Sequence, residues 1–398
     1  MSEKAWTGNK GEWGEAYVLL RLLGEGTVHN ADDELYRIDT QYSRIAAIMR
    51  QESNGDLLRF SVYSKIPHGS SDALIAVERN RELIATIPAL RFKEAADALY
   101  ETIKGESKAT FPSDVQVFLE SIGCCQLKAG SSHKADLAAR VLDHFTGSII
   151  DKHYSIKSLI GSEPTLANVS RLTFFEYELR GLDEAGYREL ESMPMSGGPW
   201  LKDKVARAEQ LCDAIVFAGV SGEVFGKNLK TCHYRCPQVM AYALLYSYSV
   251  KGKRSPDVLH LLQEQDPAGF GPDDLEDYEI AYRKYLWAVL FGMMPSKRWT
   301  DNESVDGYLI AKDDGDVLSY QISQRRKFEN YLLCHSALDT PARRSSTDGS
   351  AMQALGTVIE RSGKYYLRLN LQVRFKQEKY KGDHPVSEEA DYFLLSTT

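Results

Sequence analysis

The sequence predicts an α/β protein, and three observations support that prediction. Residues 12–23 place apolar side chains every three to four positions, as one face of a helix requires. Residues 57–66 and 74–87 either alternate between apolar and polar side chains or carry β-branched ones, which is typical of strands. Residues 365–376 alternate without a break. Helical and strand patterns therefore share one chain.

The N-terminal elements follow from these periods. The apolar face of the first helix consists of Trp13, Tyr17, Leu20 and Leu23. Gly24 is a suitable stop for it. Residues 92–104 and 113–121 are predicted to form two more helices, and Ser113 caps the second. No Pro/Gly/Ser-rich linker separates these helices from the chain beyond residue 121.

The chain beyond residue 178 is mainly helical by pattern. Four helices are predicted, at residues 201–217, 238–250, 256–265 and 275–294. The first places Ile215 on its apolar face, and Ser255 with Pro256 forms a suitable cap and first residue for the third. A hairpin with a Lys-Asp-Asp-Gly-Asp turn comes next at residues 306–322, and then a helix at residues 323–333.

The distribution of apolar residues argues against a secreted or membrane-spanning protein. The chain has 398 residues, of which 43% are hydrophobic, and can bury a large core. Residues 1–10 hold no apolar signal-peptide region, and the longest apolar runs, at 239–246 and 285–294, are about half the length of a membrane span. The sequence therefore predicts a cytoplasmic protein that is not associated with a membrane.

The cysteine pattern suits a reducing compartment. Cys232 and Cys236 flank His233 in a motif that looks like a metal ligand set. No second Cys/His pair stands at the spacing of a zinc site, so buried or unused thiols are the favoured interpretation.

Charge is distributed unevenly along the chain. The net charge is −8, but residues 325–381 hold twelve bases and five acids, a local charge of +7 that leaves −15 on the rest. A protein that presents one face to a polyanion needs such an asymmetry. A merely solvated basic face would give the same count.

Asp136 and Lys157 are the candidate catalytic pair. Asp136 heads one apolar run and Lys157 lies inside a second, with a Gly-containing turn between them. Two strands joined in this way hold the two side chains next to each other. A carboxylate binds a divalent cation through hard oxygen ligands, and an ammonium nearby orients or deprotonates an attacking water. This arrangement suits phosphodiester hydrolysis, although α/β proteins without any active site also contain such residues.

Five blocks of sequence resemble HpaII-type restriction endonucleases, which belong to the PD-(D/E)xK nuclease superfamily. They are Ser-Ser-His-Lys-Ala-Asp at 131–136, Ser-Ile-Lys-Ser at 155–158, Pro-Thr-Leu-Ala-Asn at 164–168, residues 7–15 and residues 363–375. The blocks occur in the family's order over almost the whole chain. The middle of the chain, about 183–302, matches only in its helical character.

The resemblance implies a PD-(D/E)xK core, in which helices flank a mixed central sheet, with a helical insertion and a C-terminal β segment. We expect an N-terminal segment at 1–110, whose first helix joins the nuclease core. The core itself is expected at 111–335, with the insertion at about 183–302. A DNA-reading loop and hairpin are expected at 336–398.

The resemblance also implies roles for the catalytic residues. Asp136 is expected to bind Mg²⁺ and to orient the scissile phosphate, and Lys157 to act beside the attacking water. Lys134 either contacts phosphate or is an ordinary surface lysine.

The chain departs from the family pattern at Ser155, where the second acid of (D/E)xK is expected. A hydroxyl is a weaker metal ligand than a carboxylate, so the Ile156 carbonyl, water and the phosphate would complete the coordination. One well-bound ion is therefore favoured over two. Asp151 is an alternative carboxylate if the chain folds back.

Glu12 and Glu15 are candidates for a further metal contact. They are three positions apart and therefore neighbours on one helical face. In nucleases of the implied fold a helix before the sheet brings a glutamate towards the metal, and the spacing of Lys-Gly-x-x-x-Glu favours Glu15. The alternative is a solvated acid in the first turn, stabilised by the helix dipole.

The C-terminal segment supplies the DNA-reading candidates. Alternation over residues 364–376 predicts a strand with one buried face and one exposed row that includes Lys364, Arg368, Asn370, Gln372 and Arg374. Arg can bond guanine, and Asn or Gln can bond adenine, through paired hydrogen bonds. Arg343 and Arg344 lie at the tip of a Pro-containing loop at 339–346 that could enter a groove. A solvated sheet face is the alternative.

Together these features predict a type II restriction endonuclease that cuts both strands of a short palindrome in double-stranded DNA with Mg²⁺. The expected ends carry a 5′-phosphate, and the resemblance makes CCGG, the site of the family's named member, the default target. Palindromic cutting favours a homodimer, or a monomer that acts on each strand in turn, and a cognate DNA methyltransferase would protect host DNA. The alternatives are a structure-reading repair or recombination nuclease of the same fold and a DNA-binding protein whose nuclease site has decayed.

Overall fold

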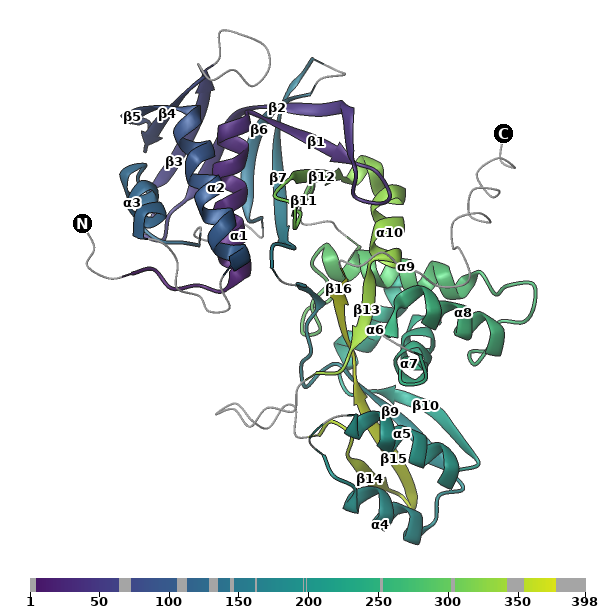
Figure 1. Ribbon diagram of the computed structural model, residues 1–398. Helices are drawn as coiled ribbons and strands as arrows, with labels where there is room; N and C mark the ends of the chain where they lie inside the picture. Colours follow the sequence, from purple (N-terminus) through teal and green to yellow (C-terminus); the bar gives the residue numbers. More distant parts are fainter. Residues whose placement is uncertain are drawn as a thin grey trace. The chain divides into compact units, whose positions relative to one another are not determined.

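The computed structural model describes residues 5–63, 73–105, 113–128, 135–143, 147–161, 163–195, 197, 199–250, 253–301, 305–341 and 354–376 (Figure 1). The chain divides into two compact units. The first unit consists of Met1–Pro164 and Glu303–Tyr331, and the second of Thr165–Asn302 and Leu332–Thr398.

The first unit is built on a large mixed sheet, which confirms the expected α/β class with a central sheet. In the described part of the chain its nine strands run in the order β1-β12-β11-β7-β6-β2-β3-β4-β5. The β1–β12 and β7–β11 pairs are parallel, and the other neighbours are antiparallel. The strands are β1 Thr27–Ala31, β2 Arg37–Gln51, β3 Leu57–Tyr63, β4 Leu74–Arg79, β5 Glu82–Pro88, β6 Leu137–Asp143, β7 Ile149–Ser158, β11 Gly307–Ala311 and β12 Val317–Gln321.

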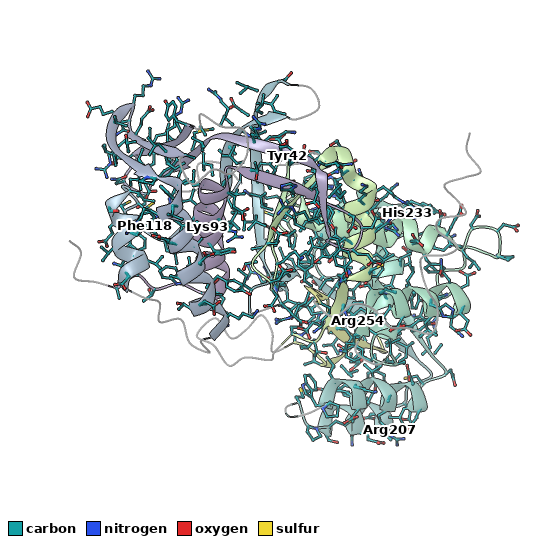
Figure 2. All side chains as sticks on the ribbon, turned by 45° about the horizontal axis from the view of Figure 1, so that its top comes forward. Tyr42, Lys93, Phe118, Arg207, His233 and Arg254 are labelled. Atoms are coloured by element: carbon teal, nitrogen blue, oxygen red, sulfur yellow. The ribbon has the colours of Figure 1, made fainter. Side chains whose placement is uncertain are left out.

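Helices α1 (Lys10–Glu25), α2 (Ala89–Gly105) and α3 (Ser113–Ser121) flank this sheet (Figure 1). All three were predicted, and the structure confirms them. The apolar face of α1 enters a core that it shares with α2 and the sheet. Phe118 of α3 meets Phe92 of α2 edge-to-face with ring centroids 5.2 Å apart; Figure 2 labels Phe118.

Helix α1 begins and ends with recognisable caps. Asn9 accepts a hydrogen bond from Glu12 N, and Glu12 in turn accepts one from Asn9 N, which completes a capping box. The helix ends at Gly26, whose φ of 67° lies in the left-handed region that glycine adopts without strain. The predicted stop at Gly24 was therefore two residues early.

The second unit contains two smaller sheets. One has the order β10-β9-β15-β14 and the other the order β13-β16-β8. Their strands are β8 Thr165–Ala167, β9 Phe174–Arg180, β10 Ala214–Val220, β13 Ser336–Asp339, β14 Val358–Arg361, β15 Lys364–Asn370 and β16 Gln372–Phe375. The helices of this unit are α4 Glu184–Ser192, α5 Trp200–Leu211, α6 Glu223–Cys232, α7 Cys236–Tyr246, α8 Ser255–Gln265 and α9 Asp277–Leu290. In the first unit a 3-10 turn, Ile322–Gln324, leads from β12 into α10 (Arg325–Cys334), which runs on into the second unit from Leu332.

Two helix predictions in this part of the chain need correction. The helix predicted at 201–217 ends at Leu211, and Ile215 lies on strand β10, which pairs with β9. Pairing with a distant strand outweighs the local helical period of this β-branched segment. Ser255 is the first residue of α8, and Arg254 occupies the cap position.

The cysteines are free thiols, as the sequence indicated. Cys232 and Cys236 are buried. His233, which Figure 2 labels, lies between them in the sequence, and its Nε2 is 3.4 Å from Asp277 Oδ2. Among the residues that the structure describes, no helix has the length and apolarity needed to cross a membrane.

Candidate active site

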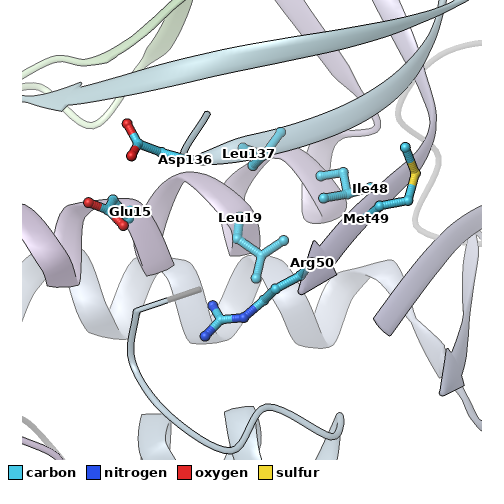
Figure 3. A pocket seen from close by; sticks show the side chains of 7 residues that line it. All are labelled: Glu15, Leu19, Ile48, Met49, Arg50, Asp136 and Leu137. Carbon is cyan, nitrogen blue, oxygen red and sulfur yellow. The ribbon is translucent and has the colours of Figure 1, made fainter. Parts of the chain in front are cut away.

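The candidate site lies in the first unit, where α1, β6 and β7 meet. Its residues line a small open pocket formed by Glu15, Leu19, Ile48, Met49, Arg50, Asp136 and Leu137 (Figure 3). The carboxylates of Glu15 and Asp136 lie at the same end of that pocket, away from Ile48 and Met49. The structure therefore brings together two acids that are far apart in sequence.

Asp136 is fixed against β7 by two hydrogen bonds. Its backbone N donates to Tyr154 O at 2.9 Å, and its Oδ2 accepts from Ile156 N at 2.8 Å. The first bond extends the β6–β7 pairing by one residue, and the second holds the carboxylate in one orientation. The expected adjacency of Asp136 and the Lys157 strand is confirmed.

Glu15 reaches the site because α1 approaches β7 unusually closely. A Cβ on Gly14 would lie 2.4 Å from Ser158 Cβ and 2.7 Å from Ser158 Oγ, so only glycine fits there. Gly14 directly precedes Glu15, and Ser158 directly follows Lys157. The contact therefore sets how near the glutamate lies to the lysine strand.

The environment raises the pKa of Glu15 to about 7. Burial is the main cause, and the neighbouring Asp136 carboxylate is the second. Lys128 and Arg50 act in the opposite direction. Two carboxylates repel each other in this partly buried pocket, and a bound cation would stabilise their ionised forms.

Burial lowers the pKa of Lys157, while Asp136 and Glu15 oppose that shift. Both acids are thus within electrostatic reach of the amine. A lysine in such a site exchanges its proton more readily near neutral pH than a solvated lysine does.

Ser155 is hydrogen-bonded to Tyr308, its register partner on the parallel neighbour β11. Tyr308 is almost fully buried and lies within electrostatic reach of Asp136. Tyr308 was not predicted from the sequence, because the pairing joins positions that are far apart in the chain and no local signal marks it.

Arg50 was also missed, and its only signal was a lone basic residue in an otherwise apolar stretch. It is buried and pairs with Glu52 through an Nε–Oε1 distance of 2.6 Å. Its Nη2 also donates to the carbonyls of Gln126 and Leu127. Arg50 therefore anchors the segment after α3 beside the pocket.

Two further predicted positions are engaged elsewhere. One carboxylate oxygen of Glu12 accepts the Asn9 N–H at 2.9 Å in the capping box, so a structural role is favoured over the predicted metal contact. The alternative acid, Asp151, pairs with Arg140 at 2.8 Å on an exposed part of the sheet. Neither joins the pocket.

The donor chemistry of the site fits a divalent cation. Glu15 and Asp136 offer carboxylate oxygens, the ligands that hard cations prefer. Within the described ranges no group of three or more His, Cys, Asp or Glu side chains is placed to hold a metal ion. A cation here would thus depend on two carboxylates, with carbonyl oxygen, water or substrate as its other ligands.

The predicted exposed row at the C-terminus is wrong for Asn370 and Gln372, whereas Lys364 is exposed and Arg368 and Arg374 are partly exposed. The polypeptide passes from one sheet to another at Leu371, between β15 and β16, and both faces of this stretch are partly covered. Asn370 is completely buried and bonds Ser170 O and Thr173 Oγ1, and Gln372 is only 8% exposed. The regular alternation could not predict this burial. Alternation indicates the two faces of a strand in a single sheet, whereas this stretch contributes strands to two sheets.

The basic residues of that row are paired with acids. Lys364 contacts Glu178 at 2.9 Å, and Arg374 contacts Asp339. Arg368 is bound to Glu176. Lys134, Arg343 and Arg344 lie outside the described residues. The assignment of this set to DNA stays a prediction.

Glu15→Gln is expected to stabilise the metal-free protein at pH 8 more than at pH 5. The folded protein holds the Glu15 proton more tightly than the unfolded chain, so this group contributes stability below its ordinary pKa. That stability is lost as pH rises through about 7. The ionised carboxylate then destabilises the fold by on the order of 2 kcal/mol, which glutamine avoids.

Urea unfolding in EDTA at both pH values measures this difference. Glu12→Gln is the control, because glutamine can keep the capping box and Glu12 lies outside the pocket; as a minor cause of the raised Glu15 pKa it should give a smaller pH dependence. Equal effects of Glu15→Gln at the two pH values would show that Glu15 titrates normally.

Comparison with known proteins identifies the class. The sequence profile of the HpaII restriction endonuclease matches residues 9–375. The chain is 30% identical to the type II restriction enzyme HpaII of Haemophilus parainfluenzae, over 93% of this chain and 99% of that protein. No solved structure matches.

The class is that of site-specific deoxyribonucleases, hydrolases that act on DNA in restriction–modification. Within that class the chain belongs to the HpaII restriction endonuclease family.

Proposed function

We propose that this protein cleaves both strands of a short palindromic DNA site with Mg²⁺, using a PD-(D/E)xK core in its first unit. The observation that carries the proposal is that Glu15, Asp136 and Lys157 lie within electrostatic reach of one another, with Glu15 and Asp136 lining one pocket. Two acids and one lysine are the groups that metal-assisted phosphodiester hydrolysis requires.

In this proposal Asp136 and Glu15 would hold the ion, and a divalent cation bound there would supply the positive charge that phosphodiester hydrolysis needs at the scissile phosphate. Asp136 keeps its orientation through the bond from Ile156 N. Lys157 holds the attacking water or accepts its proton, because burial favours its neutral form. The second acid of the (D/E)xK pattern is absent at Ser155, and the Ser155 hydroxyl and the Ile156 carbonyl would replace it as ligands. The smaller number of carboxylates favours a single ion.

The finer features of the proposal follow the family resemblance. Cleavage leaves 5′-phosphate ends, and CCGG is the first target to test. The protein acts as a homodimer or cuts one strand after the other, in the cytoplasm, with a cognate methyltransferase protecting host DNA. Catalysis belongs to the first unit, and sequence reading belongs to the second.

Incubation of the purified protein with unmethylated phage DNA and Mg²⁺, followed by sequencing of the fragment ends, tests this proposal. We expect discrete fragments with one common end sequence and no cutting in EDTA. Asp136→Asn, which removes one charge and keeps the shape, is expected to be inactive. A smear without common ends would favour a structure-reading nuclease, and intact DNA under all conditions would refute cleavage by this site.

A further inference from the structure

Glu176 holds two arginines in the four-stranded sheet of the second unit. Its Oε1 accepts from Arg368 Nε at 3.1 Å and from Arg368 Nη2 at 2.9 Å, and its Oε2 pairs with Arg361 Nη2 at 3.2 Å. Arg368 is the register partner of Glu176 across the β9–β15 pair. The Glu176 side chain is only 11% exposed. One buried acid therefore fixes two guanidinium groups.

These side chains lie on the face of the sheet that is not packed on helix α7. Successive residues alternate between faces, so Glu176 and Glu178 of β9 share a face with Tyr366 and Arg368 of β15. On the other face Tyr177 is completely buried, and its hydroxyl donates to Ala241 O in α7.

Glu176 holds both arginine side chains, and both remain partly exposed to solvent. Arg361 stacks over the ring of Tyr366, with 4.4 Å from Cζ to the ring centroid. The Arg361 side chain is 54% exposed and that of Arg368 is 31% exposed. Each arginine side chain thus stays partly exposed while Glu176 holds it.

We propose that Arg361 and Arg368 form a pre-organised guanine-reading site, which we call the arginine pair, with Glu176 as its positioning residue. The inference rests on the proposed function, because it assumes a duplex DNA ligand. A guanidinium recognises O6 and N7 of guanine through two parallel hydrogen bonds, so its orientation must be defined. A guanidinium also binds phosphate through paired hydrogen bonds, but that contact depends more on net charge, and the negative charge of Glu176 would weaken it. A buried acid that orients two arginines therefore favours base reading over phosphate binding.

The test uses the full-length protein and a pool of duplexes with a randomised centre, with Ca²⁺ in place of Mg²⁺. Bound duplexes are separated and sequenced. We expect the wild type to enrich one motif. Glu176→Gln should lower the enrichment at one or two G·C positions at least about tenfold, because two arginines lose their fixed orientation. Binding of the unselected pool should change less than about twofold, because no phosphate contact is removed.

Glu178→Gln is the matched control, because Glu178 lies on the same strand and face but contacts Lys364 and Arg180 at the exposed end. It should leave the motif unchanged. Arg361→Lys provides a second variant at an exposed position, should Glu176→Gln fail to fold. Lysine keeps the charge but lacks the planar guanidinium with its paired donors. The variant should therefore lower the enrichment at one G·C position.

The outcomes separate the inference from the proposed function. If the wild type enriches a motif and the folded Glu176→Gln and Arg361→Lys variants enrich the same motif, the proposal for the arginine pair is overturned. The proposed function is then unaffected. Uniform weakening over all sequences also overturns it, because the arginines would then bind phosphate. A wild type that enriches no motif overturns both this inference and sequence-specific cleavage.

Discussion

Lys157→Ala is expected to lower the rate of DNA cleavage by about a thousandfold while leaving sequence-specific binding intact. The amine lies within electrostatic reach of both pocket acids and acts, in our proposal, on the attacking water and not on the bases. Single-turnover cleavage measures the rate, and duplex binding with Ca²⁺ measures the affinity. Removing the group that handles the water should slow the chemical step without changing the reading of the sequence.

Lys152→Ala is the matched control, because Lys152 lies on the same strand outside the pocket, and this variant should cleave DNA at the wild-type rate. Lys157→Arg is expected to stay inactive, because arginine keeps its charge and cannot become neutral. If Lys157→Ala retains activity within about tenfold of wild type, equal to ~1.4 kcal/mol of barrier, the catalytic lysine lies elsewhere.

Gly14→Ala is expected to lower cleavage by about a hundredfold and to destabilise the first unit by about 1–3 kcal/mol. The new methyl group would lie 2.4 Å from Ser158 Cβ, so α1 must move away from β7. That movement carries Glu15 away from Asp136 and Lys157. Steady-state cleavage and urea unfolding measure the two effects.

Ser158→Gly should rescue Gly14→Ala, and this reversal makes the prediction specific. In the double variant the alanine Cβ would face Ser158 Cα at 3.8 Å, an ordinary contact distance. Gly105→Ala controls for helix effects, since a Cβ there meets no described atom within 4 Å. A double variant as inactive as Gly14→Ala would mean that the loss does not arise from this contact.

Local structure was largely predictable from the sequence. The helices α1, α2 and α3 and the β11–β12 hairpin follow from hydrophobic periods and turn residues that act over a few positions. The family blocks drew attention to Glu15, Asp136 and Lys157, and the structure places all three within electrostatic reach of one another. Periodicity failed at β10, where pairing with β9 decides the conformation.

Sequence by itself therefore determined the elements, the α/β class and the chemistry that the site residues carry. The tertiary structure alone decided which side chains meet. It paired Ser155 with Tyr308 and buried Asn370 and Gln372. The physical reason is that a hydrophobic period along the chain indicates only which face of one element is buried. Burial, ion pairing and pKa also depend on segments that are distant in the sequence and close in the fold.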